Sequence, residues 1–451
     1  MSNDAGNGSG GQPEGPDDNA ANNPFRGTPF EGMFASLGGA GIPDLSKLDL
    51  GAVMEQMQSL MQPYDGPVNW QLATDIARRT AAQEPDPSPD ATARARVADA
   101  LRLADHWLDE TTSLPSGVTT TAAWSRADWI EETTAVWQVL VGPVAEHVVA
   151  AMGNAIPEEA RSMAGPLIGM ISQAGGAMFG SQVGQALGGL SADVLTASDI
   201  GLPLGPAGKA ALLPHNVAEF AKGLDVSEDD VLLYLALREA AHQRLFAHVP
   251  WLRAHLLAAV EDFGRGVTID ISSIEQSLTS LDPSDPEAMS EAISSGLFEP
   301  KQQPSQTAAL VRLETTLALV EGWVDEVVGQ ATHERMPAAA KLQEAIRRRR
   351  AAGGPAEDTF AALVGLELRP RRLRDASALW GSLRSRQGQD ARDAVWAHPD
   401  LLPTPADLDD PLGFREDLDD VASSADDFDK ALVDLLEGEA PEAPSSENTP
   451  E

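Results

Sequence analysis

The sequence predicts a mostly α-helical protein, and three observations support this prediction. First, apolar residues recur at a spacing of three and four between Ala91 and Leu108, with Arg and Asp between them, as on one face of a helix. Second, Ser227 precedes three acidic residues and an apolar run that begins at Val231, which is typical of a capped helix N-terminus. Third, long alternating runs of β-branched residues, which are typical of strands, are scarce.

The same pattern predicts further helices along the chain. From Thr119 to Met152 we expect one or two helices, with Pro143 at a start or a kink. The helix that begins after Ser227 should reach about Phe246, and Pro250 then permits a new helix start. The remaining expected helices span Pro250 to about Gly264, Gln306 to Thr332, Ala338 to Ala351 and Arg371 to Arg386.

Composition divides the chain into three parts. Residues 1–45 are rich in Gly, Asn, Pro and Asp and hold few large apolar residues, so we expect this N-terminal segment to be disordered. Residues 46–410 are expected to form the helical domain. Residues 411–451 form an acidic tail that we expect to be largely disordered, with apolar residues for one short helix. Within 401–451, sixteen Asp or Glu residues stand against Arg415 and Lys430.

Charge and cysteine content exclude several classes of protein. The formal net charge of −37 argues against binding to nucleic acid, which requires basic surface, and predicts repulsion from anionic membranes. The chain has no cysteine, which excludes disulfides and thiolate metal sites. The first residues lack the basic start and apolar run of a secretory signal. We therefore expect a cytoplasmic protein.

One segment, Ser162 to Ala192, contains no charged residue and could be read as a membrane hairpin. Its glycines recur every fourth position, at Gly176, Gly180, Gly184 and Gly188, a spacing that lets two membrane helices approach closely. However, the segment also holds serines and glutamines, whereas a membrane span needs about 20 predominantly apolar residues. We expect tightly packed, buried helices here, and a membrane-associated protein is the weaker alternative.

The stretch from Leu237 to His242 reads Leu-Arg-Glu-Ala-Ala-His and carries most of the functional information. In a working His-Glu-x-x-His motif, two histidines four residues apart lie on one helix face and bind zinc, while the Glu acts as general base. Here Arg238 stands at the first histidine position, and Glu239 and His242 remain. Whether the protein is an enzyme depends largely on this difference.

A third ligand would have to come from another helix. Glu321 and Asp325 have the Glu-x-x-x-Asp spacing about eighty residues after the first motif. In one large class of zinc peptidases such a Glu is the third ligand, and the Asp orients a histidine from behind. The spacing alone is common in acidic helices, so its position after the first motif is what gives it weight.

Three pieces of sequence resemble a known family: Leu224 to Ser227, Leu237 to Phe246, and Val249 to Leu252. Together they resemble the zincin-like metallopeptidase family of actinobacteria, some members of which are described as associated with deazaflavin-coenzyme biosynthesis. The resemblance extends over about half of the chain, through Gly184 to Gly188, Asp199 to Pro203, Glu321 and Gly322, and Trp396 to Pro411. It implies a helical, zincin-like fold, with His242 and Glu321 at metal-ligand positions and Glu239 at the position of the general base.

Arg238 departs from this family pattern. Its guanidinium has no lone pair to offer a metal, and two protein ligands are one fewer than catalytic zinc normally has. A histidine could approach as a substitute ligand; the candidates are His248, His255 and His333. Alternatively, the guanidinium of Arg238 occupies the space of the zinc ion and pairs with Glu239 or Glu321 through charge-assisted hydrogen bonds.

The leading hypothesis is a protein of this family with a zinc-deficient, non-catalytic site, which acts as a binding or scaffolding protein for a protein or peptide partner. We expect no cofactor in that case. In the alternative, an active zinc metallopeptidase, Glu239 would activate a zinc-bound water to attack a peptide carbonyl. The run from Arg347 to Arg350 could suggest nucleic acid, but the acidity of the chain favours pairing with acidic surface or with the acidic tail.

Overall fold

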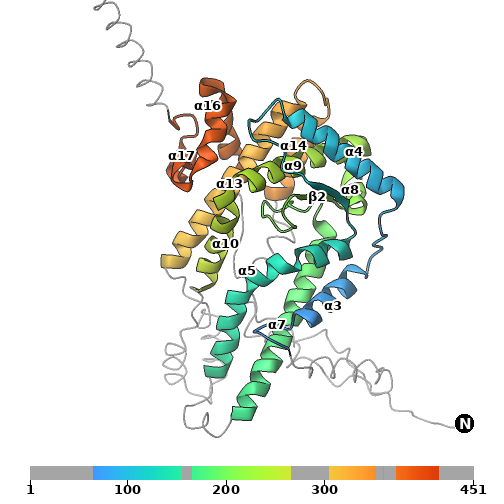
Figure 1. The fold of residues 1–451 in the computed structure, drawn as a ribbon, viewed down its shortest axis with the longest axis vertical. Coiled ribbons are helices and arrows are strands. Elements are labelled where there is room, and N and C mark those ends of the chain that lie inside the picture. The colour runs from blue at the N-terminus through green and yellow to red at the C-terminus, as the bar shows by residue number, and fades with distance from the viewer. Residues whose placement is uncertain (1–63, 155–164, 266–303, 352–358, 360–371, 416–451) are drawn as a thin grey trace, which may run out of the picture.

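The computed structural model describes residues 64–154, 165–265, 304–351, 359 and 372–415. The segment 1–45, predicted to be disordered, and all of the acidic tail beyond Arg415 lie outside these residues. Within them the fold is mostly helical, as predicted, with two short strands (Figure 1). The helices are α3 (Trp70–Ala81), α4 (Ala91–Leu108), α5 (Arg126–Asn154), α7 (Gly165–Asp193), α8 (Pro214–Ala221), α9 (Glu228–His248), α10 (Pro250–Arg265), α13 (Pro304–Thr332), α14 (Ala339–Ala351), α16 (Leu373–Ala394) and α17 (Pro405–Asp409).

The two strands correct part of the sequence prediction. Residues from Thr119 onward were expected to be helical, but β1 (Thr120–Ala123) pairs in parallel with β2 (Lys209–Leu212) before α5 begins at Arg126. The pairing partner of β1 lies almost ninety residues away, so local sequence gave no sign of it. Helix α5 then runs as one helix through Pro143.

Helix α9 lies at the centre of the fold and carries the Arg-Glu-x-x-His motif. It begins at the predicted cap, where the Ser227 hydroxyl accepts a hydrogen bond from the Asp230 amide at 3.1 Å. From Val231 to Leu245 nearly every side chain is buried, because α4, α8 and α13 pack around the helix. A helix that is buried on all sides places its polar residues in an environment of low dielectric constant.

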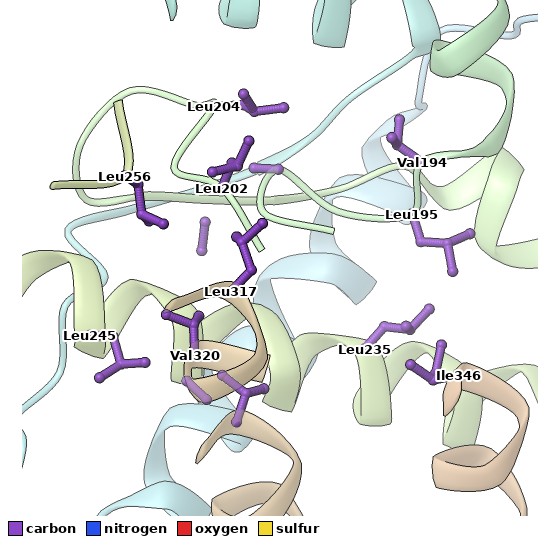
Figure 2. Packing of buried hydrophobic residues seen from close by; sticks show 14 of the residues in the cluster. Val194, Leu195, Leu202, Leu204, Leu235, Leu245, Leu256, Leu317, Val320 and Ile346 are labelled. Atoms are coloured by element: carbon purple, nitrogen blue, oxygen red, sulfur yellow. The ribbon is translucent and has the colours of Figure 1, made fainter. Parts of the chain in front are cut away.

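The core around α9 is closed by a loop between α7 and β2. Figure 2 shows Leu202 and Leu204 of this loop above side chains from α13 and α9. Leu235 and Leu245 of α9 are 1% and 0% exposed, so the motif between them is enclosed at both ends by apolar packing. This packing holds α9, α13 and the loop in fixed positions relative to one another.

The glycines of α7 allow α3 to lie directly against it. A Cβ added at Gly180 would lie 2.7 Å from the Asn69 carbonyl oxygen, and one at Gly184 would lie 2.5 Å from the carbonyl oxygen of Ala73. The every-fourth-residue stripe therefore brings two helices of the same chain together, as the prediction of tight packing required. Among the helices that the structure describes, none is long and apolar enough to cross a membrane.

Candidate functional site

The residues singled out in the sequence lie on α9 and α13, which pack together with α14 (Figure 1). Arg238 and His242 lie four residues apart on one face of α9. Glu321 comes from α13 and Arg350 from the end of α14. Glu321 is completely buried, so its charge must be balanced by neighbouring protein groups.

Both oxygens of Glu321 are bound by nitrogen atoms of other side chains. Arg238 Nη2 donates to Oε2 at 2.5 Å. His242 Nε2 lies 3.0 Å from Oε1, and Arg350 Nη2 donates to the same oxygen at 3.1 Å. The carboxylate thus sits between two guanidinium groups and an imidazole ring, which are the strongest kinds of hydrogen-bond donors available to it.

These neighbours decide the protonation state of Glu321. Burial alone would raise its pKa, but Arg350, His242 and Arg238 outweigh burial and hold the pKa far below the usual range for Glu. The carboxylate is therefore ionised and can only accept hydrogen bonds. It follows that His242 carries its proton on Nε2, the nitrogen that faces Glu321.

The other nitrogen of His242 is the one that could serve a ligand. Nδ1 is buried and has no hydrogen-bond partner among the described residues. The ring of His242 stacks on Phe246, one turn further along α9, with the ring centroids 6.0 Å apart. This contact fixes the orientation of the imidazole. The N–H that faces Glu321 is thus used as a donor, and the lone pair of the ring lies on Nδ1, away from Glu321.

A loop glycine, Gly201, lies directly against the carboxylate of Glu321. Gly201 has φ +77°, a backbone conformation that favours glycine. A Cβ at this position would lie 2.9 Å from Glu321 Oε1. Two residues earlier, the Asp199 carboxylate accepts a hydrogen bond from Arg349 at 2.9 Å, which ties the loop to α14. Loop, α13 and α14 therefore form one buried ionic cluster.

Glu239 faces a different set of partners from Glu321. Its Oε2 accepts from the Ser198 backbone N–H at 3.0 Å, and its Oε1 accepts from Gln243 Nε2 at 2.9 Å. Burial raises the pKa of Glu239, and the nearby His242 and these donors offset that rise only in part. Two residues, Glu239 and Glu321, were predicted as possible partners for Arg238. In the structure Arg238 pairs with Glu321, whereas Glu239 binds Ser198 of the loop.

Asp325 does not orient a histidine, which corrects the expectation from its spacing. Its Oδ2 accepts hydrogen bonds from Arg347 at 2.5 Å, Ser377 at 2.8 Å and Gln343 at 3.0 Å. All three partners come from α14 and α16, which the sequence could not place next to α13. Asp325 instead anchors these two helices to α13.

The run of four arginines also differs from its prediction. We expected Arg347 to Arg350 to pair with acidic surface or with the acidic tail, but three of the four reach buried carboxylates. Arg347 pairs with Asp325, Arg349 with Asp199 and Arg350 with Glu321. Arg348 alone stays on the surface, with 78% of its side chain exposed, and pairs with Glu344. Helix α14 thus places positively charged side chains next to carboxylates in the interior.

Residues 68–414 match the model of a protein family described as zincin-like metallopeptidase. This chain belongs to the zincin-like metallopeptidase family. No curated protein matches it. A crystal structure described as a "putative hydrolase with a novel fold", from Chloroflexus aurantiacus, is similar with a TM-score of 0.56 and 20% sequence identity. The similarity covers 78% of this chain and 99% of that chain and supports the fold alone.

The residues that the structure brings together at Glu321 do not fit zinc in this zincin-like protein. Among the residues that the structure describes, no group of three or more His, Asp or Glu side chains could hold a metal ion. Arg238 stands where the sequence resemblance implies the first ligand, and the Glu321 oxygens already accept from three donors. A zinc ion would have to displace buried cations from this carboxylate.

The three histidines considered as substitute ligands belong to no metal-binding group either. His248 is exposed and contacts the Ser116 carbonyl oxygen at 3.2 Å. His255 packs edge-on against Trp251, with the ring centroids 5.6 Å apart. His333 lies exposed just after α13. The substitute-ligand hypothesis is therefore wrong for the described part of this zincin-like domain.

Two partners of the site escaped the sequence analysis, Arg350 and Ser198. Arg350 was treated as part of a charged run, yet the buried residues of α14, Leu342 and Ile346, recur at helical spacing and point to positions 349 and 350 as the next inward ones. That periodicity could have placed Arg350 inside. Ser198 binds Glu239 through its backbone N–H, and no side-chain pattern reports such a bond.

Proposed function

We propose that this zincin-like protein is non-catalytic and that two buried arginines, Arg238 and Arg350, take the place of the zinc ion. In this proposal the chain keeps the family fold but works as a binding or scaffolding protein. A protein or peptide is the partner class that a peptidase fold suits best. The protein then needs no metal to fold or to bind.

The arrangement around Glu321 carries the proposal. A carboxylate that holds zinc must direct a lone pair at the ion, with the remaining ligands converging on the same point. Here Arg238 and Arg350 donate to opposite oxygens of Glu321 at 2.5 and 3.1 Å. Positive side chains stand where the positive ion would stand, and they preserve the charge balance of the buried site.

The surroundings of Glu239 support the same proposal. A general base must come within hydrogen-bond reach of the water that it activates. Glu239 is 0% exposed, and its two oxygens accept from Ser198 and Gln243. A carboxyl held in this way contributes to packing between α9 and the loop rather than to hydrolysis.

Zinc stoichiometry by elemental analysis tests the proposal. The protein is purified without a metal-affinity tag, incubated with zinc and desalted, in unmodified form and as two double variants. We expect no bound zinc in the unmodified protein. With Arg238→His and Arg350→Gln combined, the ligand set is restored and the second cation removed, so we expect about one zinc ion per chain.

The matched control combines Arg238→His with Arg348→Gln. Arg348 belongs to the same arginine run but lies on the surface, so this variant keeps Arg350 on Glu321 and should bind zinc more weakly than the first double variant. About one zinc ion per unmodified chain would overturn the proposal and favour an active metallopeptidase. Equal zinc binding by the two double variants would show that Arg350 does not take part.

A further inference from the structure

A cavity of about 190 Å³ opens between α9, α13 and α14. At its mouth, Pro337 and Ala340 are exposed. At its inner end lies Tyr234 of α9, which is only 1% exposed. Thr332, Met336 and Gln343 are among the other residues that line it. The cavity is thus open at one end and ends at a tyrosine in the interior.

The hydroxyl of Tyr234 is buried next to Arg238, and its proton has no acceptor among the described residues. Burial also raises the pKa of this phenol, so the group keeps its proton and is a donor. A buried hydroxyl without a partner is uncommon in folded proteins and costs free energy. Its position on the cavity wall gives it access to a ligand that enters from outside.

Two further donors next to this tyrosine are also without partners. Arg238 lies four residues after Tyr234 on α9, and its Nη1 atom is buried and unpaired; the same holds for Nε of Arg347. Gln343, which lines the cavity, donates to Asp325, and Asp325 also binds Arg347. The hydroxyl of Tyr234 is therefore a donor on the cavity wall, and the positive charges of Arg238 and Arg347 act on it.

The charges of the residues around Tyr234 also favour a negatively charged ligand. Arg238, Arg347 and Arg350 carry three positive charges, whereas Glu321 and Asp325 carry two negative ones. The pair formed by Arg349 and Asp199 is neutral by itself. Among the five side chains Arg238, Arg347, Arg350, Glu321 and Asp325, the positive charges outnumber the negative ones by one, which favours an anion next to Tyr234.

We propose that this cavity binds a small carboxylate, with the carboxylate group at Tyr234 and the body of the molecule against Met336 and Pro337. A dry cavity of about 150 Å³ holds a benzene ring, so a ligand with a single ring or a short branched chain fits here. Glycine at 329 leaves room for that body. The site does not depend on whether Glu321 can bind zinc.

The chain offers a direct readout because it has only two tyrosines, Tyr64 and Tyr234. Protein made with 3-fluorotyrosine should give two ¹⁹F resonances, which Tyr64→Phe and Tyr234→Phe assign. Benzoate is the probe, with benzamide as its neutral analogue. We expect benzoate to shift the Tyr234 resonance saturably, with a dissociation constant in the millimolar range or below, and to bind at least about tenfold more tightly than benzamide.

Tyr64 and Gly329 provide the controls. The Tyr64 hydroxyl donates to the Gln173 carbonyl oxygen at 2.7 Å, outside the cavity, so its resonance should not move. A Cβ at Gly329 would meet only Gln343 Nε2, at 3.6 Å, so Gly329→Leu can be accommodated and should block the cavity. In this variant an unshifted Tyr64 resonance and an unchanged circular-dichroism spectrum confirm folding, and the benzoate response of Tyr234 should vanish.

Three results would overturn the proposal. In the first, the Tyr234 resonance does not respond to benzoate, which means that water satisfies these donors. In the second, both tyrosine resonances shift together, which indicates non-specific binding. In the third, benzamide binds as tightly as benzoate, or Gly329→Leu leaves the response intact, which shows that neither charge nor the cavity selects the ligand.

Discussion

Arg238 Nη2 lies 2.5 Å from Glu321 Oε2, and the two side chains are 5% and 1% exposed. Because neither group can reach water, each depends on the other for the compensation of its charge. The charge of Glu321 is thus balanced by cations that the chain itself supplies. Removing one member of such a pair costs more than the pair contributes, since the remaining charge stays buried.

Charge reversal at Arg238 should strongly destabilise the protein. In Arg238→Glu a second carboxylate faces Glu321, so we expect the free energy of unfolding to fall by about 3–5 kcal/mol, measured by urea denaturation with tryptophan fluorescence. Arg102→Glu is the matched control. Arg102 lies on α4 with 72% of its side chain exposed and pairs with Asp99, so the loss should stay within about 1 kcal/mol. If the two variants unfolded at the same urea concentration, Arg238 would not be held by Glu321.

Glu321 should stabilise the fold at neutral pH and lose this effect in acid. Its pKa in the folded protein is lowered, so its contribution is complete above the unfolded value of about 4.3 and declines as the pH falls below it. We therefore expect Glu321→Gln to be less stable than the unmodified protein by a constant amount above about pH 5 and by a shrinking amount in more acidic solution. Urea denaturation across this range measures the difference, with the exposed Glu131→Gln as control. A difference that grew in acid would contradict the ion pair.

Glu239 should behave in the opposite way. Its pKa is raised by burial, so the folded protein retains a proton that the unfolded chain has released above about pH 4.3. Stability should then fall as the pH rises through the folded value. Because glutamine resembles the protonated form, Glu239→Gln should match the unmodified protein in acid and become relatively more stable toward neutral pH. Parallel stability curves for the two proteins would show that Glu239 titrates normally.

The glycines of α7 should be sensitive to a single methyl group only where α3 lies against them. At Gly184 a Cβ would lie 2.5 Å from the Ala73 carbonyl oxygen, so Gly184→Ala should lose about 1–3 kcal/mol. At Gly189 no atom lies within 4 Å of the added Cβ, and Gly189→Ala should be neutral or more stable by up to about 1 kcal/mol. Thermal unfolding of the two variants compares them. Equal losses of stability in the two variants would mean that helix propensity, and not the close approach of α3, determines the effect of the added methyl group.

Sequence periodicity predicted the helices well, because a helix is determined largely by residues close together in the sequence. The limits expected for α4, Ala91 and Leu108, are those of the structure, and the cap at Ser227 is present. Strand β1 could not be predicted, because its four residues become a strand only by pairing with β2. Local sequence carries the propensity of a segment but not the identity of the partner that it meets in the fold.

The same limit applies to the site. The approach of Arg238, His242 and Glu321 was expected from the family resemblance together with helical spacing. The partners of Asp325 were not, because Arg347 and Ser377 lie on helices whose packing against α13 depends on the whole fold. A run of charged residues on a helix is usually interpreted as solvated surface. On α14, however, the buried residues Leu342 and Ile346 are spaced so that the next position on the same helix face is Arg350.

The position of Arg238 bears on whether the stability of the folded state depends on the concentration of metal ions. When a site is built around an exchangeable ion, stability rises with the logarithm of the free ion concentration and falls when a chelator is added. A guanidinium is joined to the chain by covalent bonds and has no concentration of its own. Under the proposed function, the three helices that meet at Glu321 would therefore be held together independently of how much metal the surroundings contain.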